Sequence, residues 1–530
     1  MSLQVCSITY AHPGEDVLFH DMSLSVSDGE KIAVAGNNGA GKSTLLKIIS
    51  GELLPSCGQV MYEGKVYVVP QHFGQFNDMT VAHALGVGKK LEALHNILAG
   101  SVSEDDFTAL GDDWDIENRA VRALDQWGIG HLPLDSPMNR LSGGEKTRAF
   151  LAGIEMNSPS IVLMDEPTNH LDSVSRELLY NFVESSRSAV IVVSHDMELL
   201  NRMSSIYELS DGRLAYYPMS YDEYEAVRDA GRQALVSQLE DCRKELAKAR
   251  KTAQDAMQRQ LKHNSRGEKH SQKKGLARIV MGNMKDQAEN STARLDKVQQ
   301  EKMQEMNAKI RGLNDSITDI LAMKVDFHTP VQHLGKRQIE TCGLNYAYGD
   351  SGLMWGGGLD IIVRCGERIH LTGDNGSGKS TFLRLLVGEQ EPVQGSVWRS
   401  GGLEYVYLDQ EYSFLDGSLS VFGQVQRYGV NVPEHELKIC LCRFLFTEPF
   451  WDRKCSSLSG GEKMRLALCC LMIRKSTPDI IIADEPTNNI DITNMKILSA
   501  SLKDYGGTLI VVSHDTAFAR EIGLSRTIAL

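Results

Sequence analysis

The second half of this chain repeats the first. Four motifs occur twice and in the same order: GNNGAGKST (36–44) and GDNGSGKST (373–381), LSGGEKTR (141–148) and LSGGEKMR (458–465), IVLMDEPTNHLD (161–172) and IIIADEPTNNID (480–491), and IVVSHD (191–196 and 510–515). A chain of 530 residues is also too long for a single hydrophobic core. An ordered repeat on this scale indicates two copies of one domain, so we expect an α/β protein built from two related domains.

The first motif has the pattern G-x-x-x-x-G-K-[ST], and in both copies it lies between an apolar strand and a helical pattern. Its glycines allow backbone N–H groups to wrap phosphates at a helix N-terminus. Lys42 and Lys379 are expected to reach the β- and γ-phosphates, while Ser43 and Ser380 hold Mg²⁺. A glycine-rich turn without a ligand would explain one copy better than two. The predicted nucleotide-binding loops are Gly36, Asn37, Asn38, Gly39, Ala40, Gly41, Lys42, Ser43 and Thr44, and Gly373, Asp374, Asn375, Gly376, Ser377, Gly378, Lys379, Ser380 and Thr381.

Each third motif is a buried-strand pattern that ends in two carboxylates. The first carboxylate, Asp165 or Asp484, is placed to bind the metal ion. The second, Glu166 or Glu485, can polarise the water that attacks the γ-phosphate. Alone, such a pair is usually a solvated turn. After a phosphate-binding loop it predicts the other half of an ATPase site.

The second motif, LSGGE, has a purely structural alternative, because S-x-x-E is also a helix capping box. A capping box accounts for the serine and the glutamate but does not require the two glycines between them. Glycines permit a close backbone approach to an anion. With the other motifs present, the predicted nucleotide contacts are Ser142, Gly143, Gly144, Ser459, Gly460 and Gly461.

On these motifs the chain resembles the ATP-binding cassette (ABC) superfamily, and the resemblance covers both repeats nearly end to end. It implies Mg²⁺ contacts from Gln71 and Gln410, γ-phosphate contacts from His195 and His514, D-loop positions at Asp172 and Asp491, and adenine stacking by Tyr10 and Tyr346. A core tyrosine is a nearly equal alternative at each of the last two positions.

In this superfamily two cassettes close face to face, which implies composite sites. One site would join Lys42, Asp165 and Glu166 to Ser459, Gly460 and Gly461; the other would join Lys379, Asp484 and Glu485 to Ser142, Gly143 and Gly144. All motifs are intact in both copies, so both sites are expected to hydrolyse ATP.

Heptad spacing marks the segment between the repeats as a coiled coil. Apolar residues recur at Leu235, Leu239, Cys242, Leu246, Ala249 and Ala253, and again at Met306, Ile310, Leu313, Ile317 and Ile320. The pattern predicts an antiparallel hairpin of two helices, each about 40 residues and about 60 Å long. Asn264, Ser265 and Gly267 are turn formers. The expected domains are a first cassette over 1–217, a helical hairpin linker over 218–326 with its tip at about 264–286, and a second cassette over 327–530.

This linker is basic although the whole chain carries a formal net charge of −13. Residues 243–285 hold 13 Lys or Arg and 3 Asp or Glu, and the stretch RGEKHSQKKGLARIV (266–280) is the expected tip. A solvated helical face normally mixes charges of both signs. A concentrated positive charge fits contact with nucleic-acid phosphates, and we predict such contacts for Lys269, Lys273, Lys274 and Arg278.

Tandem cassettes with a basic helical hairpin between them resemble the ABC-F subfamily. The resemblance implies a cytosolic ATPase that binds the ribosomal E site and directs its linker at P-site tRNA and the peptidyl-transferase region. Gln71 and Ser142 are 71 positions apart, whereas Gln410 and Ser459 are 49 apart, so about 22 extra residues look like the subfamily's arm, shortened, within about 72–140. The segment 277–295 is more similar to the Vga/Lsa ribosome-protection type than to housekeeping translation factors.

Two alternatives stay open, an ATPase subunit of an ABC transporter and a DNA-acting ABC ATPase. The chain has no apolar run of the roughly 20 residues that span a bilayer. Its first residues do not follow the pattern of a secretory signal, and its ten cysteines include no CxxC pair. We therefore expect a cytoplasmic protein, monomeric with intramolecular pairing of its cassettes.

Overall fold

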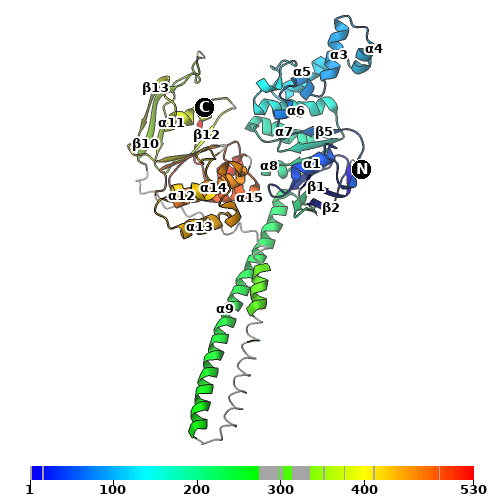
Figure 1. Ribbon diagram of the computed structural model, residues 1–530. Coiled ribbons are helices and arrows are strands. Elements are labelled where there is room, and N and C mark those ends of the chain that lie inside the picture. The colour runs from blue at the N-terminus through cyan, green and yellow to red at the C-terminus, as the bar shows by residue number, and fades with distance from the viewer. Residues whose placement is uncertain are drawn as a thin grey trace. The chain divides into compact units, whose positions relative to one another are not determined.

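The computed structural model describes residues 3–14, 17–273, 297, 303–312, 335–349, 352–374, 376–409, 412–474, 476–488 and 490–530. The chain forms two compact units, one made of residues 1–222 and 323–530 and the other of residues 223–322 (Figure 1). The first unit contains both copies of the repeat, and the second is helical wherever it is described. The predicted α/β class, with two cassettes and a helical linker, is confirmed.

A parallel sheet organises the first cassette. Its strand order is β5-β6-β7-β3-β8-β9, with only the β8–β9 pair antiparallel. The strands are β3 (Lys31–Ala35), β5 (Val66–Val69), β6 (Ile161–Asp165), β7 (Ala189–Val193), β8 (Ser205–Ser210) and β9 (Arg213–Tyr217). Ligands of such sheets bind outside the carboxyl ends of the strands. This order places the chain segments that follow β5, β6, β7 and β3 next to one another at that edge.

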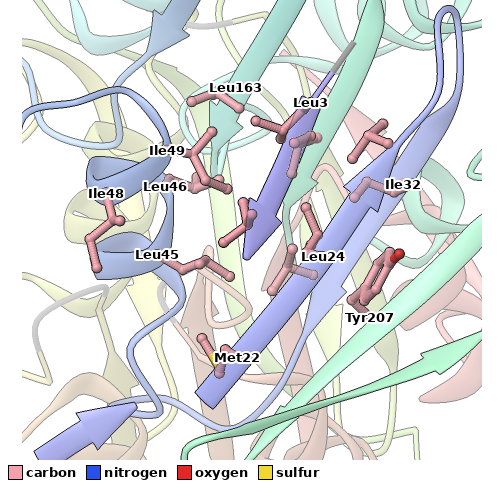
Figure 2. Close-up of a cluster of buried hydrophobic side chains, with 14 of the residues drawn as sticks. Leu3, Met22, Leu24, Ile32, Leu45, Leu46, Ile48, Ile49, Leu163 and Tyr207 are labelled. Atoms are coloured by element: carbon pink, nitrogen blue, oxygen red, sulfur yellow. The ribbon is translucent and has the colours of Figure 1, made fainter. Parts of the chain in front are cut away.

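A second, antiparallel sheet packs against the first through the helix that follows the phosphate-binding loop. It consists of β1 (Leu3–Ala11), β2 (Val17–Val26) and β4 (Cys57–Tyr62) in the order β2-β1-β4, and the helix is α1 (Lys42–Ile49). Leu3, Leu24, Ile32 and Leu45 lie in one buried cluster between these elements (Figure 2). This core fixes α1, and therefore Lys42, relative to the sheet edge.

The second cassette repeats this plan. Its parallel sheet has the order β14-β15-β16-β12-β17, and its antiparallel sheet has the order β11-β10-β13. The strands are β10 (Arg337–Asn345), β11 (Ile362–Arg364), β12 (Arg368–Thr372), β13 (Gln394–Arg399), β14 (Tyr405–Leu408), β15 (Ile480–Asp484), β16 (Thr508–Val512) and β17 (Arg526–Ala529). The shared plan confirms that the sequence repeat is a repeat of structure.

The helices of the cassettes differ mainly in one place. The first cassette has η1 (Gly74–Phe76), α2 (Val81–Ala84), α3 (Gly88–Leu98), α4 (Glu104–Leu110), α5 (Ile116–Gln126), η2 (Met138–Arg140), α6 (Gly143–Asn157), α7 (Ser173–Ser185) and α8 (Met197–Leu200). The second has α11 (Lys379–Val387), α12 (Val421–Tyr428), α13 (Glu434–Arg443), η4 (Glu448–Phe450), η5 (Cys455–Ser457), α14 (Gly460–Ile473), α15 (Ile492–Asp504) and α16 (Thr516–Glu521). A single β-bridge pairs Thr80 with Pro137 just before α2, and another pairs Ser420 with Lys454 just before α12, so these two helices begin at equivalent positions. The extra length of the first cassette therefore lies in the packed pair α3–α4.

The linker contains a longer helix than the sequence predicts. Helix α9 (Tyr221–Lys273) has 53 residues and runs through Asn264, Ser265 and Gly267. The helix ends at Lys273, inside the predicted tip of about 264–286, so the three turn formers lie in its last turns rather than at a break. Two predicted seam residues, Leu239 and Leu246, are buried, and residues 245–253 share one cavity with Met303 and Met306 of a returning helical segment. Lys274, Arg278, Leu313, Ile317 and Ile320 lie outside the described residues.

Within the described ranges, no helix combines the length and the apolar character that a membrane crossing requires.

Candidate functional site

The phosphate-binding loop of the first cassette has a backbone that only glycine allows at key points. Gly36 has a φ of 153°, and a Cβ there would lie 2.5 Å from the carbonyl oxygen of Leu209. Gly41 has a φ of 98°, and its Cβ would lie 2.7 Å from the ring of Phe19. Between them the chain curls around Lys42, whose Nζ donates to the carbonyl oxygens of Gly36 at 2.7 Å and of residue 37 at 3.1 Å. The loop thus holds a buried cation at the N-terminus of α1.

The second loop has the same geometry. Gly373 and Gly378 have φ values of 153° and 94°, and Lys379 Nζ donates to the carbonyl oxygens of Gly373 at 2.7 Å and Asp374 at 3.0 Å. Burial lowers the pKa of Lys379, whereas the charges of Glu485 and Asp484 raise it. Asn375 of this loop lies outside the described residues.

The metal-binding carboxylates predicted from the sequence lie at the ends of two equivalent strands. Asp165 ends β6 and Asp484 ends β15. Asp484 Oδ2 accepts from Ser380 Oγ at 2.7 Å and from the Tyr407 hydroxyl at 2.9 Å. Asp165 Oδ1 is buried with no hydrogen-bond partner among the described residues. Burial raises the pKa of Asp165, although a hydrogen bond from Ser43 acts in the opposite direction.

The next residue in each strand–loop turn, Glu166 or Glu485, is held in a strained conformation. Both glutamates have a φ of 50°, in the left-handed region, which costs a residue with a side chain about 1–3 kcal/mol. Their backbone N–H groups donate to the carbonyl oxygens of Val193 at 2.8 Å and Val512 at 2.9 Å on the neighbouring strands. These bonds stabilise a turn that directs the glutamate side chains into a buried position.

Each glutamate faces the histidine of the following strand. His195 Nε2 lies 3.3 Å from Glu166 Oε1, and His514 Nε2 lies 3.4 Å from Glu485 Oε1. Burial, followed by the charge of Asp165, raises the pKa of Glu166 to about 8, and burial raises the pKa of Glu485 to about 7. Burial lowers the pKa of His195 to about 3 and that of His514 to about 4. At neutral pH both imidazoles are therefore neutral, and neither contact is a salt bridge.

A cavity of about 540 Å³ joins these groups in the first cassette. From the first cassette it is lined by Asn38, Gly39, Gly41, Lys42, Ser43, Thr44, Gln71, Asp165, Glu166 and His195, among others. Ser459 and Gly460 of the second cassette also line it. Burial lowers the pKa of Lys42 and of Lys379, and among the charges that act in the opposite direction are Asp491 at Lys42 and Asp172 at Lys379. Each phosphate-binding lysine therefore has an acidic residue of the other copy nearby.

Both LSGGE serines also cap helices. Ser142 accepts from the Glu145 backbone N–H at 3.3 Å while Glu145 accepts from the Ser142 N–H at 2.8 Å, and Ser459 and Glu462 form the same box. The structural explanation of this motif is thus correct. It does not exclude a nucleotide contact, because Ser459 and Gly460 line the cavity beside Lys42.

The two predicted adenine-stacking tyrosines are packed into the cores. Tyr10 is 7% exposed in the buried core of the first cassette, and Tyr346 packs against the equivalent core of the second. Two residues further on, His12 lines the cavity, and Tyr348 is half exposed with its hydroxyl 2.9 Å from Thr381 Oγ1. His12 and Tyr348 are therefore better placed to stack a base. Both repeats carry an aromatic ring two residues after the predicted tyrosine, just past the end of the strand.

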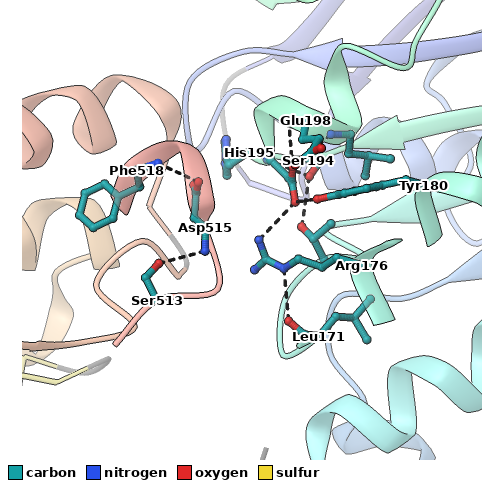
Figure 3. A network of polar contacts seen from close by, with 12 residues as sticks. Leu171, Arg176, Tyr180, Ser194, His195, Glu198, Ser513, Asp515 and Phe518 are labelled. Atoms are coloured by element: carbon teal, nitrogen blue, oxygen red, sulfur yellow. Dashed lines mark hydrogen bonds and ion pairs between the residues drawn. The ribbon is translucent and has the colours of Figure 1, made fainter. Parts of the chain in front are cut away.

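Gln71 lines the cavity, whereas Gln410 lies outside the described residues. Asp172 and Asp491 act as N-caps of α7 and α15, accepting from backbone N–H groups at 2.9 and 2.7 Å. One polar network was not anticipated from the motifs. Asp196 Oδ2 accepts from the Tyr180 hydroxyl at 2.7 Å and from Arg176 at 3.3 Å (Figure 3).

Comparisons with known proteins agree with this geometry. The ABC transporter family matches residues 19–169 and 357–488. ATP-binding protein Uup of Haemophilus influenzae is 31% identical over 536 residues, covering 94% of this chain and 74% of that protein. Probable ATP-binding protein YbiT of Escherichia coli O157:H7 is 30% identical, covering 96% and 92%. ABC transporter F family member 2 of Arabidopsis thaliana is 28% identical, covering 97% and 74%.

Among solved structures, archaeal ribosome recycling factor aABCE1, in complex with the ribosomal stalk protein aP1, is similar with a TM-score of 0.58 at 19% identity. The similarity covers 99% of this chain and 87% of that one, and it concerns the fold alone. Since the family match spans more than half of the residues and relatives at 30–31% identity span nearly the whole length, this chain belongs to the ABC transporter family, as an ATPase of its F subfamily.

Proposed function

We propose that the two cassettes bind and hydrolyse ATP at two composite sites, each built from the phosphate-binding loop of one cassette and the LSGGE motif of the other. The cavity that brings Ser459 and Gly460 to Lys42 supports the first site. The effect of Asp172 on the pKa of Lys379 supports the second. The other nucleotide contacts predicted from the LSGGE motifs are Gly461 in the first site and Ser142, Gly143 and Gly144 in the second.

The oxygen groups beside each lysine fit Mg²⁺, which prefers carboxylate and hydroxyl ligands. Asp165 offers a buried oxygen without a hydrogen-bond partner in the described chain, and Asp484 lies within hydrogen-bond distance of Ser380. The residues that would hold the ions are Ser43, Gln71 and Asp165 in the first site, and Ser380, Gln410 and Asp484 in the second. Bound Mg²⁺ would neutralise charge on the β- and γ-phosphates.

Glu166 and Glu485 are the proposed general bases. Their turn conformation and buried position hold each carboxyl beside the histidine of the following strand, which supports this role. His195 and His514 are proposed to contact the γ-phosphate. Neutral imidazoles suit this role because each can donate one hydrogen bond to a phosphate oxygen. His195 Nε2 also lies 3.2 Å from Asn38 Oδ1 of the phosphate-binding loop.

We further propose that this ATPase acts on the ribosome, with its cassettes at the E site and its linker directed at P-site tRNA and the peptidyl-transferase region. The observation that carries the proposal is the linker, a 53-residue helix in a segment whose residues 243–285 have 13 positive and 3 negative side chains in an acidic chain. Such a charge suits rRNA and tRNA phosphates. The proposed contacts are Lys269, Lys273, Lys274 and Arg278.

The structural similarity to a ribosome recycling factor and to ABCE1 in a ribosome-bound complex, with a TM-score of 0.54, is consistent with this proposal. Two roles fit it equally, a translation factor and an antibiotic ribosome-protection factor of the Vga/Lsa type. Growth and translation assays with and without ribosome-targeting antibiotics would separate the two roles.

Sedimentation tests the proposal. A chain carrying both Glu166→Gln and Glu485→Gln should stay closed on ATP, so we expect it to co-sediment with ribosomes through a sucrose gradient containing ATP. Without ATP it should remain in the soluble fractions. Recovery with the membrane pellet would favour the alternative, an ATPase subunit of an ABC transporter. Recovery in neither fraction would contradict both.

A further inference from the structure

The two loops that carry His195 and His514, called the switch loops here, are anchored in the same way. In each, the aspartate after the histidine caps a short helix: Asp196 Oδ1 accepts from the N–H groups of residues 198 and 199 at 3.0 and 3.1 Å, and Asp515 Oδ1 accepts from that of residue 518 at 2.9 Å. Each cap ties the loop to the helix that follows it. The position of each histidine therefore depends on its aspartate.

The two aspartates differ in the hydrogen-bond partners of their second carboxylate oxygen. Asp196 Oδ2 is held by Arg176 and Tyr180 of α7, and the Arg176 and Asp196 side chains are only 13% and 7% exposed. The equivalent residues of α15 are Met495 and Ser499, by the alignment of Asp172 with Asp491. Met495 has no donor, and the buried Ser499 hydroxyl has no hydrogen-bond partner in the described chain. Among the described residues, no side chain donates to Asp515.

Arg176 shares a small cavity with both aspartates. A small cavity of about 30 Å³ is lined by Arg176 and Asp196 from the first cassette and by Met495 and Asp515 from the second. The volume suffices for one or two water molecules and not for a nucleotide. Arg176 supplies the only guanidinium or ammonium group among the described residues that line it. In Figure 3 the Arg176 guanidinium points toward the loop that carries Ser513 and Asp515.

Electrostatics agree with this placement. Burial raises the pKa of Asp515, the charge of Asp196 raises it further, and the charge of Arg176 lowers it. Two carboxylates that face one cavity repel each other unless a cation lies with them. Arginine suits this position because its planar group has five donors and can serve two carboxylates.

We propose that Arg176 is a positioning residue that links the two switch loops and makes the two ATP sites unequal. In the first cassette Arg176 and Tyr180 both hold Asp196, so the His195 loop is fixed within its own domain. In the second cassette Asp515 depends on Arg176 of the other domain. Turnover at the site of Lys379, Glu485 and His514 is therefore coupled to contact between the cassettes. This inference rests on the composite sites and general bases proposed above, and it is independent of the ribosome.

The test is single-site turnover of the purified full chain. In a Glu166→Gln background, where only the second site should hydrolyse, Arg176→Met should lower kcat about fivefold or more, a typical coupling between sites. KM for ATP should change less than twofold, because Arg176 is not part of the loop that surrounds Lys379. In a Glu485→Gln background, where the first site remains, the loss should stay below twofold because Tyr180 still holds Asp196.

Three further variants complete the design. Adding Met495→Arg to Arg176→Met returns a cation to Asp515 from α15 of the same cassette. This double variant should recover at least half of the turnover rate at the second site. The effects of Arg176→Met and Asp515→Asn should be non-additive, since both break one link. Arg122→Met, an exposed position on α5, is the matched control and should leave both rates unchanged.

Equal losses at both sites, a loss confined to the first site, or additive effects with Asp515→Asn would overturn the proposal. If Arg176→Met lowers turnover at both sites because the chain misfolds, its thermal unfolding midpoint will also fall. In that case the test is whether Met495→Arg restores turnover at the second site. The parent chains test the base assignment separately. Full turnover in either Glu→Gln parent would contradict that assignment and not the Arg176 link.

Discussion

The residues that carry the proposed chemistry are held in unfavourable states. Glu166 and Glu485 combine a left-handed backbone with burial, and their pKa values lie above the usual range. Unpaired buried carboxyls favour the neutral form. Strain and burial of this kind commonly occur at functional sites. At the residue scale, both cassettes therefore show the same departure from an ordinary strand–loop turn.

This state leads to the first residue-scale prediction. Glu166→Gln together with Glu485→Gln should reduce ATP turnover about 100-fold or more, the usual contribution of a general base. Folding stability should change little, because glutamine resembles the protonated carboxyl that burial already favours. ATP binding should persist, since the lysines and the phosphate-binding loops are intact.

The measurements are phosphate release, nucleotide binding and thermal unfolding on the purified chain. Glu104→Gln, at an exposed position in α4, is the matched control and should behave as wild type. A double variant that retains wild-type turnover would show that another group activates the water.

At the scale of single elements, α9 shows where local signals fail. Asn264, Ser265 and Gly267 are turn formers, yet the helix continues through them to Lys273. Asn, Ser and Gly each cost a helix about 1 kcal/mol or less, which need not end a helix that is already long. The heptad seam was a better guide, because it depends on packing over many turns and Leu239 and Leu246 are buried as it required.

The element-scale prediction concerns the charge of the linker. Changing Lys269, Lys273, Lys274 and Arg278 to alanine should weaken ribosome association most at low salt. Each lost phosphate contact should reduce the slope of log affinity against log salt by about 0.7–0.9. ATP binding should be unaffected because each cassette has its own core.

Ribosome pelleting across a salt series measures this slope. Changing four exposed acidic residues of α4 and α9 to alanine provides the control: Glu104, Asp105, Glu240 and Asp241. An unaltered slope in the basic-residue variant would mean that the linker charge serves only to keep the helix solvated.

At the scale of the whole molecule, the repeat matters because each proposed site needs residues from both cassettes. Ser459 and Gly460 contribute to a cavity whose other walls belong to the first cassette. Each cassette alone has the fold and the phosphate-binding loop, but its proposed site is completed by the other.

Pairing leads to a reciprocal prediction. Ser142→Arg should lower turnover at the site of Lys379, measured in a Glu166→Gln background, and spare the site of Lys42. Ser459→Arg, in a Glu485→Gln background, should do the reverse. Both changes remove an identical capping box, worth about 1 kcal/mol, so the loss of helix stability is matched. Damage confined to the cassette that carries the mutation would refute the composite sites.

The sequence by itself determined the two domains, their fold class and most of the proposed site. Motif residues such as Lys42, Asp165 and His195 could be identified because each follows a strand of a parallel sheet, and such strands bring their carboxyl ends to one edge. Only the tertiary structure decided which aromatic side chains face the cavity, since Tyr10 packs into the core while His12, just past the end of β1, lines the cavity, and no motif distinguishes the two. Likewise only the structure brought Arg176 and Asp515 to one cavity. Contacts between two domains depend on how their surfaces pack, and no short sequence motif predicts that packing.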